Sequence, residues 1–453
     1  MAPISRRQLL GAGGALGIAA LLSACGSTGP GGSSDAITIW NNLADAQQND
    51  YFRRHFAEGY RGTYPVRFSP KADSTIDRLI QTALAAGSGP SIIVTPGPSS
   101  FVSSYWSAGY LADLGPYAKK YGWADTFAPW ALGASQVDGK LVTLPASYET
   151  MVFYSNPATL DKLGLTPPKT QEEFEEFCAE AKGKGHVPLS AGNADYKGAN
   201  EWFVGLALNH GAGPEAVYSA LRGETKWTDP VFVDAIDRMA SYFKKGWFGG
   251  GVGLYFTNNF PTIYQQLASG KAAGMLSGTW DFSNFGSYFG RAAGNDATWD
   301  WTTVPSLGKG VPQVVWDLAI GQSVGINTNF ADTAAAADYL DFLTTDVKTI
   351  IASVEQMNFE PPPVHISATD FSAKADPRIV RLYSQLSAAK SIGYTTWTFF
   401  PQQTETYMID YFENVITGRL SAKAYCAGIE SRFATERAEG RVPDAPKPGG
   451  GLS

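Results

Sequence analysis

Ile37-Thr38-Ile39-Trp40 is a short apolar strand that begins a regular alternation of strands and helices. A second strand follows at Val66-Arg67-Phe68, and apolar residues recur every three or four positions on either side of it, as on helix faces. The two faces consist of Phe52, Phe56 and Tyr60, and of Ile76, Leu79, Ile80, Ala83 and Leu84. Gly87-Ser88-Gly89-Pro90 ends the second helix, and Ile92-Ile93-Val94 reads as a buried strand. This order predicts a doubly wound α/β unit.

The loops after these strands are candidate ligand contacts, because such sheets bind ligands beyond the carboxyl ends of their strands. The loops span residues 40–45, 69–75 and 95–100. They place Asn41, Asn42 and Asp73 as candidate ligand-binding residues, with a capping or turn role as the equal alternative. Trp40 precedes the first loop, and its ring serves either the ligand or the core.

The rest of the chain contains two long extended stretches separated by helices. Residues 141–154 form the first and turn at Asn156-Pro157, and residues 311–326 form the second. We expect these stretches to cross between two lobes, since 453 residues are too many for one core. Helical patterns cover residues 172–182, 231–245, 336–343, 377–390 and 404–436.

The composition is that of an acidic globular protein rich in aromatic residues. The formal net charge of −7 becomes −9 without Arg6 and Arg7, which argues against nucleic acid or an anionic membrane surface as a partner. The chain has 12 Trp, 21 Tyr and 25 Phe. Flat rings stack on the apolar faces of sugars, and packing in a core is the alternative use for them.

Residues 1–25 read as an export signal that ends in a lipidation site. Ser5-Arg6-Arg7-Gln8-Leu9-Leu10 supplies a twin-arginine region, and an apolar run continues to Leu22, too short to span a bilayer. Leu22-Ser23-Ala24-Cys25 resembles a bacterial lipobox, so Cys25 is the expected lipid-bearing residue, anchored to the outer face of the cell membrane. An ordinary signal peptide with an incidental cysteine is the alternative. Residues 26–35 form an expected flexible tether.

Other reactive residues give little indication of chemistry. Cys178 and Cys426 form a possible disulfide, with two buried thiols as the alternative. The four histidines have no metal-ligand spacing, so we expect neither a metal nor another cofactor. Gly321-Gln322-Ser323-Val324-Gly325 matches the pattern of a nucleophile elbow, but Ile326 continues the extended run where that motif requires a helix.

Several ordered landmarks resemble the extracellular solute-binding proteins of family 1, which include maltodextrin-binding proteins. After Ile37-Thr38-Ile39-Trp40 they are Val137-Asp138-Gly139-Lys140, Leu144-Pro145 and Val152-Phe153-Tyr154-Ser155-Asn156, then the segment from Leu163 to Phe174, and the segment from Leu267 to Trp280. The resemblance covers residues 36–440. It implies an α/β, two-lobed periplasmic-binding-protein-like fold of type II, in which each lobe is a mixed sheet flanked by helices and the ligand cleft lies between the lobes.

The expected lobes are discontinuous in sequence. Residues 36–148 and 315–362 form lobe 1, and residues 149–314 and 363–442 form lobe 2. Residues 443–453 form a Pro/Gly-rich tail that we expect to be flexible.

The resemblance also assigns residues to the cleft. Tyr148 and Glu149 lie at the first crossing, where the family has a cleft carboxylate, and Trp280 with Asp281 matches the segment whose ring lines the sugar site. Aromatic platforms are expected at Trp202 and Trp397, and Trp316 with Asp317 lies on the returning segment. Each Trp has core packing as its alternative, and each acid a salt bridge. Thr95-Pro96-Gly97-Pro98 departs from the family by lacking an acidic residue.

We therefore expect a monomeric, non-enzymatic binding lipoprotein that delivers a sugar or oligosaccharide to the permease subunits of an ABC importer. The alternatives are another polar solute, such as a glycerophosphodiester or a polyamine, and a surface glycosidase with two cleft carboxylates. The candidate loops contain few basic residues, which a phosphate ligand would require.

Overall fold

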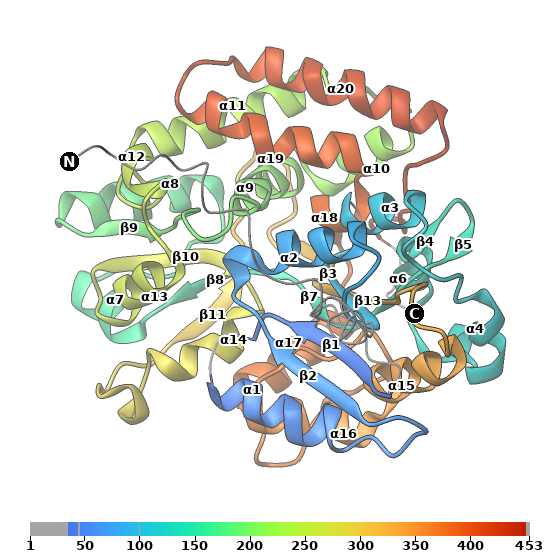
Figure 1. Cartoon of the computed structure of the whole chain (residues 1–453). Coiled ribbons are helices and arrows are strands. Elements are labelled where there is room, and N and C mark those ends of the chain that lie inside the picture. The colour runs from blue at the N-terminus through green and yellow to red at the C-terminus, as the bar shows by residue number, and fades with distance from the viewer. Residues whose placement is uncertain (1–34, 44–45, 99, 450–453) are drawn as a thin grey trace, which may run out of the picture.

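The computed structural model describes residues 35–43, 46–98 and 100–449 (Figure 1). The predicted signal, its Cys25 and residues 26–34 of the predicted tether lie outside the described residues. Three sheets organise the described part of the chain: a five-stranded sheet, a four-stranded sheet, and a three-stranded sheet that joins them.

The five-stranded sheet has the order β2-β1-β3-β13-β6. β1 is parallel to β2 and β3, whereas β13 is antiparallel to β3 and to β6. All five residues of β1 are buried, as in a parallel strand that helices cover on both faces. The strands are β1 (Ile37–Asn41), β2 (Val66–Pro70), β3 (Ile92–Pro96), β6 (Leu144–Pro145) and β13 (Gln322–Ile326).

Helices flank this sheet in the predicted alternation, with two local differences. The helix that begins with α1 (Ala46–Phe52) ends in a π-helical turn at Ala57, before Tyr60. Leu79, predicted on the buried face of α2 (Asp73–Ala85), is 41% exposed and faces solvent. The core of this half contains Ile37, Phe52, Phe56, Ile92, Val324 and Leu340, the last of these from α15 (Thr333–Thr345).

The four-stranded sheet has the order β11-β8-β10-β9. β10 runs antiparallel to β8 and parallel to β9, and every residue of β8 and β10 is buried. The strands are β8 (Met151–Ser155), β9 (Val187–Ser190), β10 (Ala272–Gly278) and β11 (Asp300–Thr303). The largest apolar cluster of the described residues packs beside this sheet, around helices α8 (Gln171–Gly183), α9 (Ala199–Leu206) and α11 (Pro230–Lys244).

The three-stranded sheet lies at the junction of these two halves. Its order is β14-β12-β7, with β14 (Ile392–Tyr394), β12 (Trp316–Ile320) and β7 (Tyr148–Glu149). Only Gly321 separates β12 from β13, so one extended segment belongs to two sheets, and β6 and β7 make the reverse passage. A third segment runs alongside, because the Tyr148 amide donates to the Pro361 carbonyl at 2.8 Å. These crossings confirm the two-lobed α/β fold with segments that connect the lobes.

Two antiparallel helices, α19 (Gln402–Ile416) and α20 (Ala422–Ala438), form the red layer at the top of Figure 1. The single helical pattern predicted over 404–436 is therefore two helices with a break at residues 417–421. Other helices are α3 (Ser100–Ser107), α4 (Gly115–Tyr121), α5 (Trp123–Thr126), α6 (Pro129–Ala134), α7 (Pro157–Leu163), α10 (Pro214–Leu221), α12 (Val252–Tyr255), α13 (Phe260–Ala268), α14 (Asp281–Asn284), α16 (Val347–Met357), α17 (Pro377–Ser387) and α18 (Thr396–Phe399), and the short strands β4 (Gln136–Val137) and β5 (Lys140–Leu141) form a hairpin.

Three further observations concern the chain ends and the surface. The tail predicted to be flexible from residue 443 is instead held against β14 in its described part: the Tyr394 hydroxyl donates to the Pro446 carbonyl at 2.6 Å, and the Ile392 amide donates to the Pro448 carbonyl at 3.0 Å.

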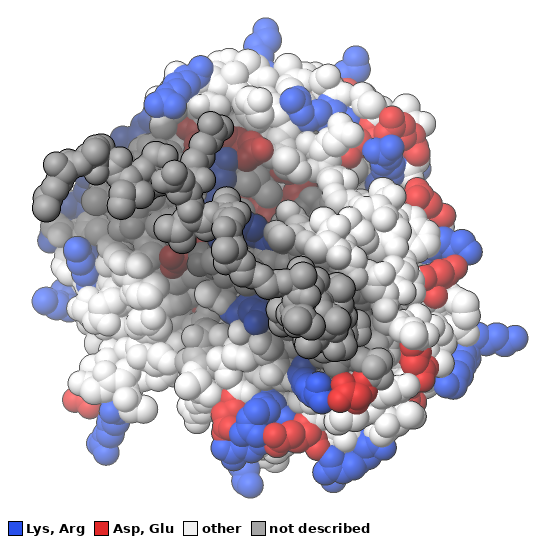
Figure 2. Space-filling view, viewed as in Figure 1, with Lys and Arg blue, Asp and Glu red and all other residues white. Residues whose placement is uncertain are grey.

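Within the described residues, no helix combines the length and apolar character needed to span a bilayer. Figure 2 shows basic and acidic side chains interspersed over the visible face.

Candidate functional site

A cavity of about 590 Å³ lies between the five-stranded sheet and the elements around the four-stranded sheet. This volume falls within the usual range for small-molecule sites. The carboxyl ends of β1 and β3 and the crossing segments form one side of it, and α9, α13 and α14 form much of the other. Polar and aromatic lining residues include Asn41, Asn42, Thr95, Ser147, Glu149, Tyr196, Glu201, Trp202, Tyr264, Trp280, Asn284, Gln322, Glu360 and Trp397.

Three tryptophans form an aromatic wall of this cavity. Trp202 lies on α9, Trp280 immediately precedes α14, and Trp397 lies on α18. The ring centroids of Trp202 and Trp280 are 4.9 Å apart at an interplanar angle of 44°, and those of Trp280 and Trp397 are 6.2 Å apart at 71°. Because the rings are inclined to one another, they present faces and edges along a curved wall rather than a single flat platform.

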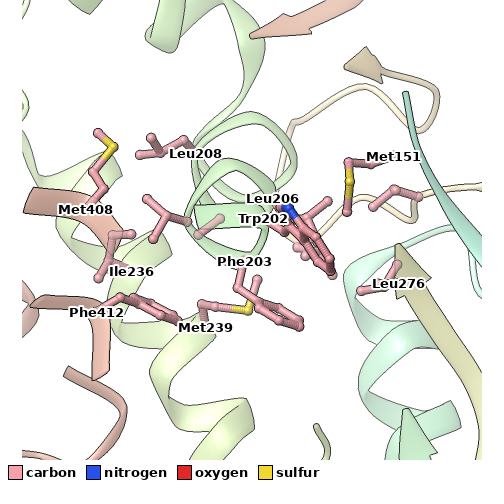
Figure 3. Close-up of a cluster of buried hydrophobic side chains, with 14 of the residues drawn as sticks. Met151, Trp202, Phe203, Leu206, Leu208, Ile236, Met239, Leu276, Met408 and Phe412 are labelled. Carbon is pink, nitrogen blue, oxygen red and sulfur yellow. The ribbon is translucent and has the colours of Figure 1, made fainter. Parts of the chain in front are cut away.

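A close-packed core holds Trp202 in place. Figure 3 shows its ring within the buried cluster, with Met151 and Leu276 on one side of it and Ile236 and Met239 on the other. Trp202 is 8% exposed and still lines the cavity. Trp202 therefore packs in the core and also lines the cavity, so core packing and a position at the candidate site do not exclude each other.

Glu149 is a cavity carboxylate on the segment that passes between the two larger sheets. It lies on β7, is 5% exposed, and accepts a hydrogen bond from the Trp397 indole at 3.1 Å. Gly321 is required beside it, because a Cβ atom there would lie 2.0 Å from the Glu149 Oε2 atom. Burial raises the pKa of Glu149 from its ordinary 4.5 to about 7.

Glu360 is hydrogen-bonded to Glu149 and lies on the third crossing segment. Burial, followed by the charge of Glu149, raises the pKa of Glu360 well above its ordinary value. The Thr279 hydroxyl donates to this carboxyl group. Two carboxyl groups in hydrogen-bond contact retain one proton between them, because the doubly charged state is unfavourable.

A second carboxyl pair lies behind Trp202. Glu201 lines the cavity, is 1% exposed, and accepts a hydrogen bond from the Thr396 hydroxyl at 2.8 Å. Burial and the neighbouring Glu405 raise the pKa of Glu201 well above its ordinary value. The cavity therefore has two buried acidic positions on the side of the tryptophans.

Amide and hydroxyl groups also line the cavity. Gln322 donates through its side chain to Asn41 at 3.3 Å and to Asn42 at 3.4 Å. Its backbone amide donates to the Ser147 hydroxyl at 2.9 Å. These neutral groups offer both donors and acceptors, which is the chemistry that ligand hydroxyls require.

The structure brings half of the predicted ligand residues to the cavity. Those that line it are Asn41, Asn42, Glu149, Trp202, Trp280 and Trp397. Trp40, Tyr148, Asp281, Trp316 and Asp317 lie away from the lining. The side chain of Asp73, at the start of α2, is outside the part of the chain that the structure describes.

Local geometry explains why the two Trp-Asp pairs differ from the prediction. Trp316 and Asp317 lie on β12 and face opposite ways: Trp316 packs on Trp301, and Asp317 pairs with buried His210 at 2.9 Å. Asp281 is fully buried beneath its neighbour Trp280 and accepts a hydrogen bond from Tyr264 at 2.5 Å. Burial raises the pKa of Asp281 from 3.8 to about 6.

Two other predicted contacts serve packing. Trp40 is 9% exposed within an apolar cluster, and the Lys71 ammonium lies 4.8 Å from its ring centroid. Tyr148 packs its ring against Trp130, with centroids 5.6 Å apart. The alternation of β7 directs Glu149 to the cavity, so its neighbour Tyr148 faces elsewhere.

Several site residues were missed in the sequence. Glu360 precedes three prolines beside a predicted lobe boundary. That rigid run could have indicated a segment that crosses between the lobes. Glu201 is adjacent to a predicted platform ring, but on a helix adjacency alone does not indicate a shared face. Asp77 and Asp195 also line the cavity, without any distinguishing sequence pattern.

The described residues form neither a metal-binding cluster nor the possible disulfide between Cys178 and Cys426. Among the described residues, no group of three His, Cys, Asp or Glu side chains is arranged to hold a metal ion. Cys178 and Cys426 are both buried and free, so the possible disulfide is absent. They pack instead in the apolar cluster beside α8 and α20.

Comparisons with known proteins place this geometry in context. Residues 53–379 match the family model of the bacterial extracellular solute-binding proteins. A probable sugar-binding periplasmic protein of Mesorhizobium japonicum is 35% identical over 138 residues, which is 30% of this chain and 32% of the relative. The maltodextrin-binding protein MdxE of Bacillus subtilis is 21% identical over 282 residues, which is 58% and 61% of the two chains. These alignments thus span about a third and about three fifths of the relatives' lengths.

Solved structures share the fold over most of the chain. A chitin oligosaccharide binding protein superposes with a TM-score of 0.70 at 19% identity, covering 89% of this chain and all of that one. A sugar transporter component from Arthrobacter chlorophenolicus with bound laminaribiose gives a TM-score of 0.69 at 16% identity, covering 88% and 99%. At these identities the likeness establishes the two-lobed fold.

Proposed function

The chain belongs to the bacterial extracellular solute-binding proteins, and we propose that it captures a sugar or oligosaccharide outside the cytoplasmic membrane and delivers it to an ABC importer. The observation that carries the proposal is the cavity that Trp202, Trp280 and Trp397 line together with the amide groups of Asn41 and Gln322. A pyranose has an apolar C–H face and a rim of hydroxyls. Aromatic rings and hydrogen-bonding groups in one cavity match both parts of it.

The proposed mechanism is closure of the two lobes around the ligand. Gly321 lies where β12 passes into β13, and β6 passes into β7 beside it, so few backbone torsions separate the two sheets. Ligand that contacts both walls favours the closed arrangement, since those contacts exist only when the walls are close together.

Export and anchoring are part of the same proposal. The twin-arginine segment and the lipobox at Cys25 would place the protein on the outer face of the membrane, with the following residues as a tether. A sugar-binding protein held there is close to the permease subunits that receive its ligand. Metabolic labelling with a palmitate analogue should label the exported chain and not its Cys25→Ala variant.

The sugar assignment is tested by calorimetry of the folded protein against a panel of mono- and oligosaccharides. We expect saturable binding to at least one of them, weakened at least tenfold in Trp280→Ala because a stacking wall is removed. Trp106→Ala is the matched control: Trp106 is half-buried, bonded to Asp138 at 3.1 Å, and is not part of the cavity lining. Absence of binding to every sugar would exclude the assignment.

The same samples distinguish binding from hydrolysis. We expect the bound oligosaccharide to be recovered intact after prolonged incubation, since a protein that delivers its ligand to an importer releases that ligand unchanged. Shorter products that appear with wild-type protein and not with Glu149→Gln would establish a glycosidase instead.

A further inference from the structure

We propose that the solute bound in this cavity carries a protonated amine, as an amino sugar or an oligosaccharide that contains one. The inference rests on the proposed sugar-binding function and narrows its ligand class. Its basis is the charge of the cavity wall, the hydrogen-bond partners of the buried acids, and the arrangement of the aromatic rings.

The described lining of the cavity is acidic and has no basic side chain. Five carboxyl residues contribute to it, and none of the described lining residues is Lys, Arg or His. The five are Asp77, Glu149, Asp195, Glu201 and Glu360. A neutral sugar needs a few acceptors, but it has no positive charge with which to offset this concentration of acids.

The hydrogen-bond donors to the buried acids are neutral. Glu149 accepts from an indole, Glu201 from the hydroxyl of Thr396, and Glu360 from the hydroxyl of Thr279. None of the ion pairs in the described part of the chain includes Glu149, Glu201 or Glu360. Buried carboxylates are normally paired with a cation, so a ligand ammonium would supply the missing charge.

In the absence of ligand, protons take the place of that charge. Burial raises the pKa of both Glu149 and Glu201 above the ordinary value, and the charge of Glu405 raises the pKa of Glu201 further. An ammonium group near either pair favours the ionised form, so its arrival should release protons. A neutral ligand at the same position has no such effect.

The aromatic wall suits the same chemistry. Trp202, Trp280 and Trp397 line the cavity beside these acids, and the Tyr196 ring lies 6.1 Å from Trp202. Indole faces attract cations, and inclined rings present several faces to one position. The Trp397 indole also donates to Glu149, so an aromatic face and a carboxylate are adjacent at one place.

The neutral wall favours an amino sugar over a polyamine. Asn41, Asn42, Ser147 and Gln322 offer paired donors and acceptors in the same cavity as the acids. A ligand without hydroxyls would desolvate these groups without replacing their hydrogen bonds to water, whereas a sugar ring replaces them. A phosphate-bearing solute would meet the acids with charge of the same sign.

Calorimetry with ligands that differ at one ring position tests the inference. Glucosamine, N-acetylglucosamine and glucose differ only at the C2 substituent, and each is used as the monomer and as β-1,4-linked oligomers of two to five units. We expect the amine form to bind at least tenfold more tightly than its glucose and acetylated counterparts at pH 6, where the ligand amine is protonated and Glu149 still retains its proton. Binding of the amine form should release protons, seen as a dependence of the observed heat on the ionisation enthalpy of the buffer.

Variants separate electrostatic recognition from loss of structure. In Glu149→Gln and Glu201→Gln the ratio of the affinity for the amine to the affinity for the matching neutral sugar should fall at least fivefold. Glu176→Gln, on the exposed face of α8, is the matched control and should retain the full preference.

The outcomes distinguish this inference from the proposed function. Equal or tighter binding of the neutral forms, or tight binding of other neutral sugars alone, overturns the amine and leaves the sugar assignment standing. Binding of spermidine without binding of any sugar overturns both and establishes a polyamine. No binding by any of these probes overturns the amine, and the wider panel of mono- and oligosaccharides then decides the sugar assignment.

Discussion

Replacement of Glu149 by Gln should alter how the stability of the ligand-free protein depends on pH. Burial raises the pKa of Glu149 from 4.5 to about 7, so the folded protein retains a proton that the unfolded chain releases. A carboxyl group whose pKa is raised by folding stabilises the protein fully only below the unfolded pKa. That contribution is lost as the pH rises through the folded pKa. The window is therefore pH 4.5 to 7.

The size of the effect follows from the pKa difference. Each unit is worth about 1.4 kcal/mol, so the free energy of unfolding should fall by an amount on the order of 3 kcal/mol across this window because of Glu149. Gln has nearly the same shape and cannot ionise, so Glu149→Gln removes this loss. The same change removes the negative charge of Glu149, which is one cause of the raised pKa of Glu360. The pKa of Glu360 should therefore not rise further to replace the lost contribution of Glu149.

Urea unfolding at half-unit steps from pH 4 to pH 8 measures this difference. Wild type should lose more stability than Glu149→Gln between pH 4.5 and pH 7, by the amount assigned to Glu149. Glu201, Glu360 and Asp281, whose pKa values burial also raises, contribute a loss to both proteins, so the difference between the two curves is the quantity to compare. Glu176→Gln is the control and should follow wild type. Parallel curves for wild type and Glu149→Gln would refute the reasoning that the carboxyl pair retains a proton on folding.

Two further predictions concern packing. Gly321→Ala should lower the free energy of unfolding by about 1 to 3 kcal/mol, because the added Cβ would lie 2.0 Å from the buried Glu149 carboxylate. An unchanged urea midpoint would contradict this. Cys178 and Cys426 should react with a thiol reagent only after unfolding, and a reductant should leave the melting temperature unchanged, since both are free and buried; a midpoint that falls on reduction would indicate a disulfide.

Local periodicity explains why the fold could be predicted from sequence. The apolar run at Ile37-Thr38-Ile39-Trp40 and the stripes that follow have the strand and helix periods, and β1, β2, β3 and α2 form where those patterns lie. The same reasoning failed where the helical periodicity of the sequence does not show where one helix ends and the next begins, as at the break between α19 and α20. Leu79 shows the same limit, because its position on the helix stripe did not make it buried.

The composition of the site was only partly predictable. Trp202, Trp280 and Trp397 were identified by type and landmark, and each lines the cavity. The acidic partners were harder to find, because Glu149 meets Glu360 across two segments that are more than 200 positions apart in the chain. No local pattern encodes a contact between distant crossing segments.

The sequence by itself determined the alternation of strands and helices, the family resemblance and the aromatic character of the site, because these depend on residue type and near-neighbour spacing. Only the tertiary structure decided which member of each adjacent pair faces the cavity. Asp281 turns into the core beside Trp280, and Asp317 turns to His210, since strand register and helix phase fix the direction of every side chain. The tertiary structure also decided that five acids and no basic residue line the described part of the cavity. This excess of acidic residues arises only when segments that are distant in the sequence meet.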